Sequence, residues 1–199
     1  MKPVVLIVLD GWGIAPEGPG NAITLSRLPF YHRLLGTYPH GMLQASGEAV
    51  GLPRGEDGNT ETGHMNLGAG YIVYQDLPRI NLAIADGSFF KNQAFAAAID
   101  HARKYESNLH LLGLVGSGGV HSNIEHLLAL LQLCKEQEFT RVFLHLITDG
   151  RDSPPKSARM YVEQVESYLK NLGFGEIASI MGRYYAMDRD QRWERTEKA

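Results

Sequence analysis

The feature that most constrains the fold is an alternation of short, mostly apolar runs with longer amphipathic stretches. The apolar runs cover residues 109–115, 142–147 and 177–181, and the amphipathic stretches before them cover residues 92–105, 123–137 and 155–171. Mostly apolar runs of this length are typical of strands in a parallel sheet, whereas the longer stretches have helical spacing. The repeat therefore predicts an α/β fold with a mainly parallel sheet.

A fourth apolar run, residues 4–9, ends in Asp-Gly-Trp-Gly and is expected to be another central parallel strand. The ends of the helices are also signalled locally. Ser122 with Glu125 indicates a capping box, Ser153 before two prolines indicates a helix start, and Gly173 suits a C-cap.

Composition excludes several classes of function. The 199 residues are 44% hydrophobic and 21% charged, and the net charge of -3 provides no general attraction for nucleic acid. No apolar run approaches the ~20 residues of a membrane-spanning helix. Cys134 is the only cysteine, so no internal disulfide can form, and its apolar surroundings favour a buried thiol. With no signal-peptide pattern, we expect a cytoplasmic monomer acting on a small molecule, without nucleic-acid or membrane partners.

Two segments in the first third of the chain carry candidate metal and phosphoryl chemistry. Asp10 follows an apolar run and precedes two glycines, which suits a ligand for a hard metal ion, although a turn or N-cap aspartate is the alternative. Thr60 lies in GNTETGHMN, where a hydroxyl at a helix start could become a nucleophile if a base or metal lowered its pKa. The alternative for Thr60 is a simple N-cap.

The other candidates follow later apolar runs. His121 comes after a glycine-rich loop and could contact phosphate or move a proton, unless it is an ordinary surface histidine. Arg151 could grip an oxyanion and Asp152 could act as a base, unless they form a salt-bridged loop. Arg183 and Arg189 suit capture of a phosphate and a carboxylate, with the neighbouring tyrosines packed between them. Together these residues favour phosphoryl transfer on a small acid.

These segments resemble the cofactor-independent phosphoglycerate mutases of the alkaline phosphatase superfamily. The resembling segments are LDGWG at 9–13, GNTETGHMNLGAG at 58–70, VYQDLPRIN at 73–81, GGVHS at 118–122, TDGRDSPP at 148–155 and MGRYYAMDRDQRWERTEKA at 181–199. The resemblance implies interconversion of 3-phosphoglycerate and 2-phosphoglycerate in glycolysis, with two manganese ions and a phosphoenzyme. It also implies an alkaline-phosphatase-like, three-layer α/β/α fold.

The resemblance also implies a role for each candidate residue. Asp10 and Thr60 correspond to metal ligands, and Thr60 also to the phosphorylated nucleophile. The substrate-binding positions correspond to His121, Arg151, Asp152, Arg183 and Arg189. Asp152 corresponds as well to the catalytic base that moves a proton between the glycerate hydroxyls.

The implied organisation has two domains. Residues 1–74 would open a phosphatase-like, metal-binding domain, and residues 75–199 would form the first part of an inserted phosphotransferase domain. The family usually has serine where this chain has Thr60, and its members are longer, with further metal ligands beyond the matching segment. We therefore expect the chain by itself to be truncated and inactive. The alternatives are a non-catalytic fragment or interaction protein, and another metal-dependent mutase or phosphatase of the superfamily.

Overall fold

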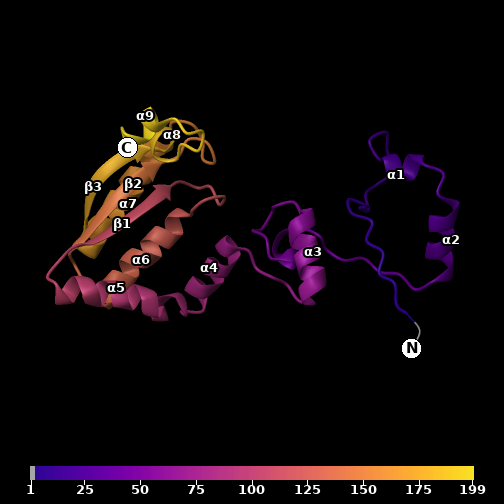
Figure 1. The fold of residues 1–199 in the computed structure, drawn as a ribbon, viewed down its shortest axis with the longest axis horizontal. Helices are drawn as coiled ribbons and strands as arrows, with labels where there is room; N and C mark the ends of the chain where they lie inside the picture. The colour runs from indigo at the N-terminus through magenta and orange to yellow at the C-terminus, as the bar shows by residue number, and fades with distance from the viewer. Residues whose placement is uncertain (1–2) are drawn as a thin grey trace. The chain divides into compact units, whose positions relative to one another are not determined.

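The computed structural model describes residues 3–199. The chain separates into two compact units, Met1–Tyr74 and Gln75–Ala199, here called unit 1 and unit 2. Figure 1 shows the elements of each unit as a ribbon. Within residues 3–199, no helix is long and apolar enough to cross a membrane.

Unit 1 is built from short helices and irregular chain. Its elements are α1 (Ala22–Leu25), α2 (Pro29–Thr37), the 3-10 helix η1 (Gly47–Val50) and α3 (Thr60–Ala69). The expected central strand at residues 4–9 is wrong, because this run forms no ladder and Val4 is 96% exposed. A parallel strand needs a neighbouring strand with which to form backbone hydrogen bonds. The described part of unit 1 contains no strand that could pair with residues 4–9.

The second half of unit 1 is held by side-chain hydrogen bonds to the backbone. The N-cap of α3 is Asn59, whose Oδ1 accepts from Thr62 N at 2.8 Å, so Thr60 is the first helical residue and not the cap. Asn66 Nδ2 donates to Val50 O at 3.0 Å, and Asn66 Oδ1 accepts from Val73 N at 2.7 Å. These bonds fix α3 against the chain before and after it.

Unit 2 has the predicted α/β architecture. Its elements are α4 (Asp76–Ala85), η2 (Phe89–Lys91), α5 (Gln93–Lys104), β1 (Leu109–Val115), α6 (Ile124–Glu136), β2 (Val142–Thr148), α7 (Ala158–Leu172), β3 (Glu176–Gly182), α8 (Arg183–Ala186) and α9 (Trp193–Thr196). The three strands lie in the order β1-β2-β3, and both pairings are parallel. The prediction of a parallel α/β sheet is confirmed.

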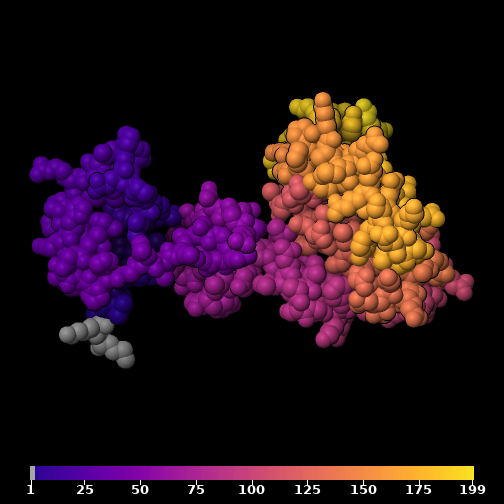
Figure 2. Space-filling model, turned by 180° about the vertical axis from the view of Figure 1, so that it is seen from behind, coloured from indigo at the N-terminus to yellow at the C-terminus, as the bar shows by residue number. Residues whose placement is uncertain are grey.

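The core of unit 2 lies between α5, α6, α7 and the sheet. Leu144 of β2, Leu131 of α6 and Val165 of α7 are all 0% exposed and belong to one cluster. Cys134 is buried in this cluster as expected, and burial raises the pKa of its thiol to about 11. Figure 2 shows the chain from α7 onward, in orange and yellow, as a continuous packed surface.

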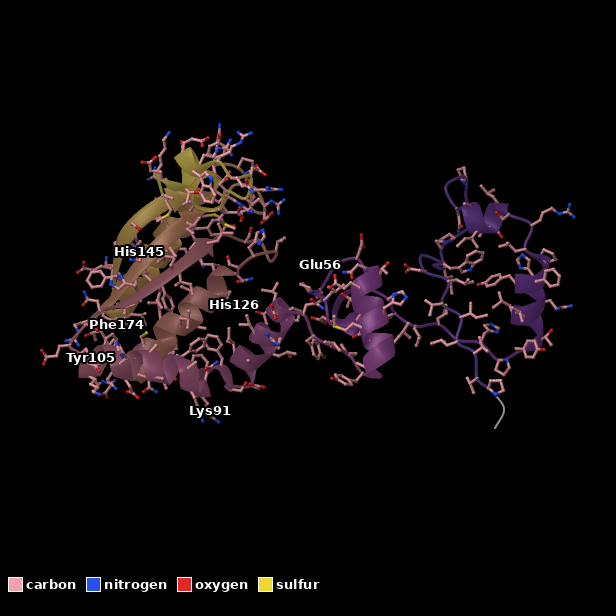
Figure 3. All side chains as sticks on the ribbon, viewed as in Figure 1. Glu56, Lys91, Tyr105, His126, His145 and Phe174 are labelled. Atoms are coloured by element: carbon pink, nitrogen blue, oxygen red, sulfur yellow. The ribbon has the colours of Figure 1, made fainter. Side chains whose placement is uncertain are left out.

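Residues that alternate with the core positions point to the opposite face of the sheet. Leu112 of β1 is paired in register with His145 of β2 and is 67% exposed. His145 Nε2 lies 2.9 Å from His110 Nδ1, and His145 Nδ1 lies 2.8 Å from Ser179 Oγ. Figure 3 labels His145 on the strand. A polar row therefore crosses all three strands on this face.

The helix ends of unit 2 agree only partly with the local signals. Gly173 has φ +80° and is the C-cap of α7, as predicted. The capping box at Ser122 is wrong, because Asn123 caps α6 and Ser122 Oγ donates to Leu114 O at 2.6 Å. Ser153 does not begin α7, whose N-cap is Ser157. Ser122 Oγ bonds the backbone of β1, Ser153 Oγ bonds the loop after β1, and these contacts replace a cap.

Candidate active site

A cavity of about 640 Å³ lies in unit 2 beside the loops that follow β2 and β3. Parallel strands direct the residues after their carboxyl ends to one edge of the sheet, where α/β proteins bind ligands. The charged and imidazole side chains that line the cavity are His121, Asp149, Arg151, Asp152, Arg183, Asp188, Arg189, Asp190 and Arg195. The structure thus brings together five predicted residues: His121, Arg151, Asp152, Arg183 and Arg189.

Arg183 is the central cation of this cavity. It begins α8 directly after β3, and its Nη1 donates to Asp149 Oδ1 and Asp152 Oδ2, both at 2.7 Å. The Arg183 side chain is 11% exposed. Its pKa is raised by hydrogen bonds first to Asp152 and then to Asp149. The guanidinium therefore stays charged and ties the end of β3 to the loop after β2.

Asp149 is the buried anion of the site, with a side chain only 2% exposed. Its Oδ1 also accepts from Arg151 N at 3.1 Å and from Asp152 N at 3.2 Å. Burial would raise the pKa of Asp149, but hydrogen bonds outweigh it, above all that from the Arg183 side chain, and the pKa falls to about 2. Sequence reasoning gave Asp149 no role, although its position directly after a buried strand was a usable signal.

The glycine-rich loop before His121 is held in place by hydrogen bonds to the Ser153 side chain. Ser153 Oγ accepts from Ser117 N at 3.0 Å and from Gly118 N at 3.4 Å, and Ser153 is 4% exposed. A Cβ on Gly118 would lie 2.8 Å from Asp152 Cβ, so only glycine allows this approach. The loop therefore holds His121 beside the Asp149–Asp152 segment, with which it lines a second, narrower pocket.

The chain after α8 forms a loop that is held by hydrogen bonds to Asp188. This carboxylate, 3% exposed, accepts from Asp190 N at 3.1 Å, Arg192 N at 2.8 Å and Arg195 Nη1 at 3.3 Å. Arg195 lies 4.0 Å from the centroid of the Tyr184 ring. Arg189 lies within this ordered loop and lines the cavity.

The cations of the cavity are not all neutralised by the protein. Within residues 3–199, Arg183 and Arg195 form ion pairs with aspartates, whereas Arg151 and Arg189 form none. Guanidinium groups without protein partners can bind a phosphate or carboxylate through two parallel hydrogen bonds. The cavity is therefore suited to a small anionic ligand.

Unit 1 carries the other two predicted residues. Thr60 Oγ1 donates to Asp10 Oδ2 at 2.8 Å, and both residues line a cavity of about 460 Å³ together with His64. His64 Nδ1 lies 2.8 Å from Thr60 O. A carboxylate and a hydroxyl are oxygen donors of the kind that hard divalent cations prefer. Asp10 and Thr60 therefore fit as part of a metal site. They do not complete one, because residues 3–199 contain no cluster of three or more His, Cys, Asp or Glu side chains that could hold a metal ion.

The fold and the cavity define an α/β protein with an arginine-lined cavity at the carboxyl ends of its strands. Comparison with known proteins identifies the family. Residues 80–199 match the family model described as the BPG-independent PGAM N-terminus. The chain belongs to the BPG-independent phosphoglycerate mutase family.

The relatives are close in sequence and longer than this chain. The 2,3-bisphosphoglycerate-independent phosphoglycerate mutase of Moorella thermoacetica is 59% identical over 198 residues, which is all of this chain and 39% of the relative. The enzyme of the same name from Chloroflexus aggregans is 55% identical, with 37% of its length covered. The crystal structure of Leishmania mexicana phosphoglycerate mutase at low cobalt concentration matches with a TM-score of 0.66 and 32% identity, covering 96% of this chain and 36% of that one.

Proposed function

We propose that this chain supplies the phosphoglycerate-binding cavity and the phosphoryl-accepting hydroxyl of a mutase that interconverts 3-phosphoglycerate and 2-phosphoglycerate in glycolysis. The observation that carries the proposal is the cavity of unit 2, which joins His121, Asp152 and three predicted arginines. Both phosphoglycerates carry a phosphate and a carboxylate. Arg151 and Arg189, which form no ion pair within residues 3–199, match two such anionic groups in number and chemistry.

Within this proposal, Arg151, Arg183, Arg189 and His121 hold the anionic groups, and Asp152 is the base. The carboxylate of Asp152 is 19% exposed at the cavity and so remains open to a ligand hydroxyl. Asp152 takes the proton of the free glycerate hydroxyl and gives it to the glycerate oxygen that loses its phosphoryl group, so that the deprotonated oxygen can accept the group from Thr60. One carboxylate can serve both steps, because they are the reverse of each other.

The proposed acceptor of the phosphoryl group is Thr60. A bond forms between Oγ1 and phosphorus while the bond between phosphorus and the glycerate oxygen breaks, and the hydroxyl proton passes from Oγ1 to solvent water. The reverse displacement returns the group to the neighbouring glycerate oxygen. Asp10 and Thr60 would hold a metal ion, for which we propose two manganese ions in the complete site. A bound metal would lower the pKa of the hydroxyl and offset the charge of the phosphoryl oxygens.

We further propose that residues 1–74 are the first segment of a phosphatase-like domain and residues 75–199 part of an inserted phosphotransferase domain. We also propose a cytoplasmic monomer. The proposal that the chain by itself is inactive follows from the metal site, since Asp10 and Thr60 alone offer too few ligands for two ions.

The proposed function is tested with a hybrid in which this chain replaces the matching 198-residue segment of the Moorella thermoacetica relative. Conversion of 3-phosphoglycerate is followed in a coupled assay with manganese present. We expect an active hybrid, an inactive chain, a loss of at least about a thousandfold in kcat for Thr60→Ala, and retained activity for Thr60→Ser, which keeps the hydroxyl.

The matched control is Thr37→Ala, which removes a threonine hydroxyl at the end of α2 in the same unit. Its activity should equal that of the hybrid. An inactive but folded hybrid, or a Thr60→Ala hybrid with full activity, would contradict the proposal. Release of inorganic phosphate without isomerisation would indicate a phosphatase instead.

A further inference from the structure

Arg183 is shared between two carboxylates through one nitrogen. Nη1 carries two N–H groups, and these are used by Asp149 Oδ1 and Asp152 Oδ2 at 2.7 Å each. Within residues 3–199, Nε and Nη2 form no hydrogen bond to the protein. Three of the five guanidinium donors are therefore left for a ligand in the cavity.

The two carboxylates differ in how firmly they are held. Asp152 is 19% exposed, whereas Asp149 is 2% exposed and its Oδ1 receives two backbone N–H groups in addition to Arg183. Asp149 Oδ2 is buried without a hydrogen bond to the described residues. Asp149 is thus an immobile buried anion, and Asp152 is the partner that faces the ligand.

We propose that Asp149 is a positioning residue for the mutase reaction: it fixes the plane of the Arg183 guanidinium and leaves Asp152 and the outer three N–H groups to the substrate. This inference rests on the proposed function, from which the roles of Arg183 and Asp152 come. A guanidinium held by Asp152 alone would follow that side chain whenever it turned toward a substrate hydroxyl. A second, buried anchor prevents this movement.

The first test uses the 199-residue chain and the isosteric variant Asp149→Asn, which keeps the shape but loses the ionic anchor. Side-chain 15N NMR of Arg183 should show distinct Nη signals in the wild type, because rotation about the Nε–Cζ bond is restricted. Averaged signals are expected in the variant. Affinity for 3-phosphoglycerate, measured by calorimetry, should fall at least about tenfold, since a misaligned guanidinium loses its paired hydrogen bonds.

Asp100→Asn is the matched control, since Asp100 bonds Arg103 at 2.9 Å with a side chain that is 70% exposed. It makes the same change of charge in unit 2 and should alter neither the Arg183 signals nor the affinity. Distinct Arg183 signals in folded Asp149→Asn would overturn the inference. If Asp149→Asn does not fold, Arg183→Lys is measured instead, because a single ammonium cannot reproduce the planar guanidinium. An Arg183→Lys chain that binds 3-phosphoglycerate with wild-type affinity would refute the inference.

The inference and the proposed function fail in different ways. A wild-type chain that does not bind 3-phosphoglycerate would count against the function proposed for this cavity, and the Arg183 signals would still decide the role of Asp149. In the active hybrid, Asp149→Asn should reduce kcat/KM by about tenfold or more, and Asp100→Asn should not. Equal values for the two variants would overturn the positioning role.

Discussion

Both units contain apolar runs, but these runs differ in whether they form buried strands. Residues 4–9 of unit 1 are aliphatic throughout, yet Leu6 is 76% exposed and the run forms no ladder. Leu144 of β2, in a run of unit 2 that is less apolar because it contains His145, is 0% exposed and lies between two parallel neighbours. The difference shows that an apolar run becomes a strand only where partner strands and covering helices surround it.

The largest expected effect is in the core of unit 2. Leu144→Ala removes a fully buried side chain and leaves a cavity that rigid neighbours fill only partly, which should lower the free energy of unfolding by about 2–5 kcal/mol. Urea unfolding measures the change, and the reaction of the buried Cys134 thiol with a thiol reagent reports opening of the same core. A loss below about 0.5 kcal/mol would show that unit 2 is less tightly packed than described.

An intermediate effect is expected from acid. The pKa of Asp149 is lowered from 3.8 to about 2, so its contribution to stability is present above about pH 4 and is lost as the pH falls toward 2. The urea midpoint of the wild type should therefore fall more between pH 5 and pH 2.5 than that of Asp149→Asn. Parallel curves for the two proteins would show that Asp149 is not ionised and paired in the folded state.

The smallest effect is expected for Leu6→Ser in unit 1. Because Leu6 is 76% exposed, its replacement should change the free energy of unfolding by no more than about 0.5 kcal/mol. The same urea titration as for Leu144→Ala makes the comparison direct. A loss above about 2 kcal/mol would mean that residues 4–9 are packed in the protein, and the contrast between the units would disappear.

Much of unit 2 could be predicted from its sequence. The runs at 109–115, 142–147 and 177–181 became β1, β2 and β3, because mostly apolar runs of this length were flanked by helices long enough to return the chain. The C-cap at Gly173 followed from the need for a positive φ. Periodicity and glycine position are local properties, and here local and tertiary preferences agree.

What could not be predicted depends on tertiary contacts. Ser122 and Ser153 are residue types suited to helix caps, but Ser122 Oγ bonds Leu114 O within β1 and Ser153 Oγ bonds the loop after β1, contacts that only the folded structure creates. The importance of Asp149 depends on Arg183, which is 34 positions away and meets it only because β2 and β3 are neighbours. The roles assigned to Asp10, Thr60, His121, Arg151, Asp152, Arg183 and Arg189 stay predictions.

The loop before His121 limits how this site can be altered by mutation. A Cβ on Gly116 would clash with Ser153 Oγ, and a Cβ on Gly118 would lie 3.0 Å from Asp152 O. A library that randomises the loop would therefore recover few folded variants at these positions. Engineering of ligand preference is better directed at Arg151 and Arg189, whose side chains line the cavity and form no ion pair within residues 3–199.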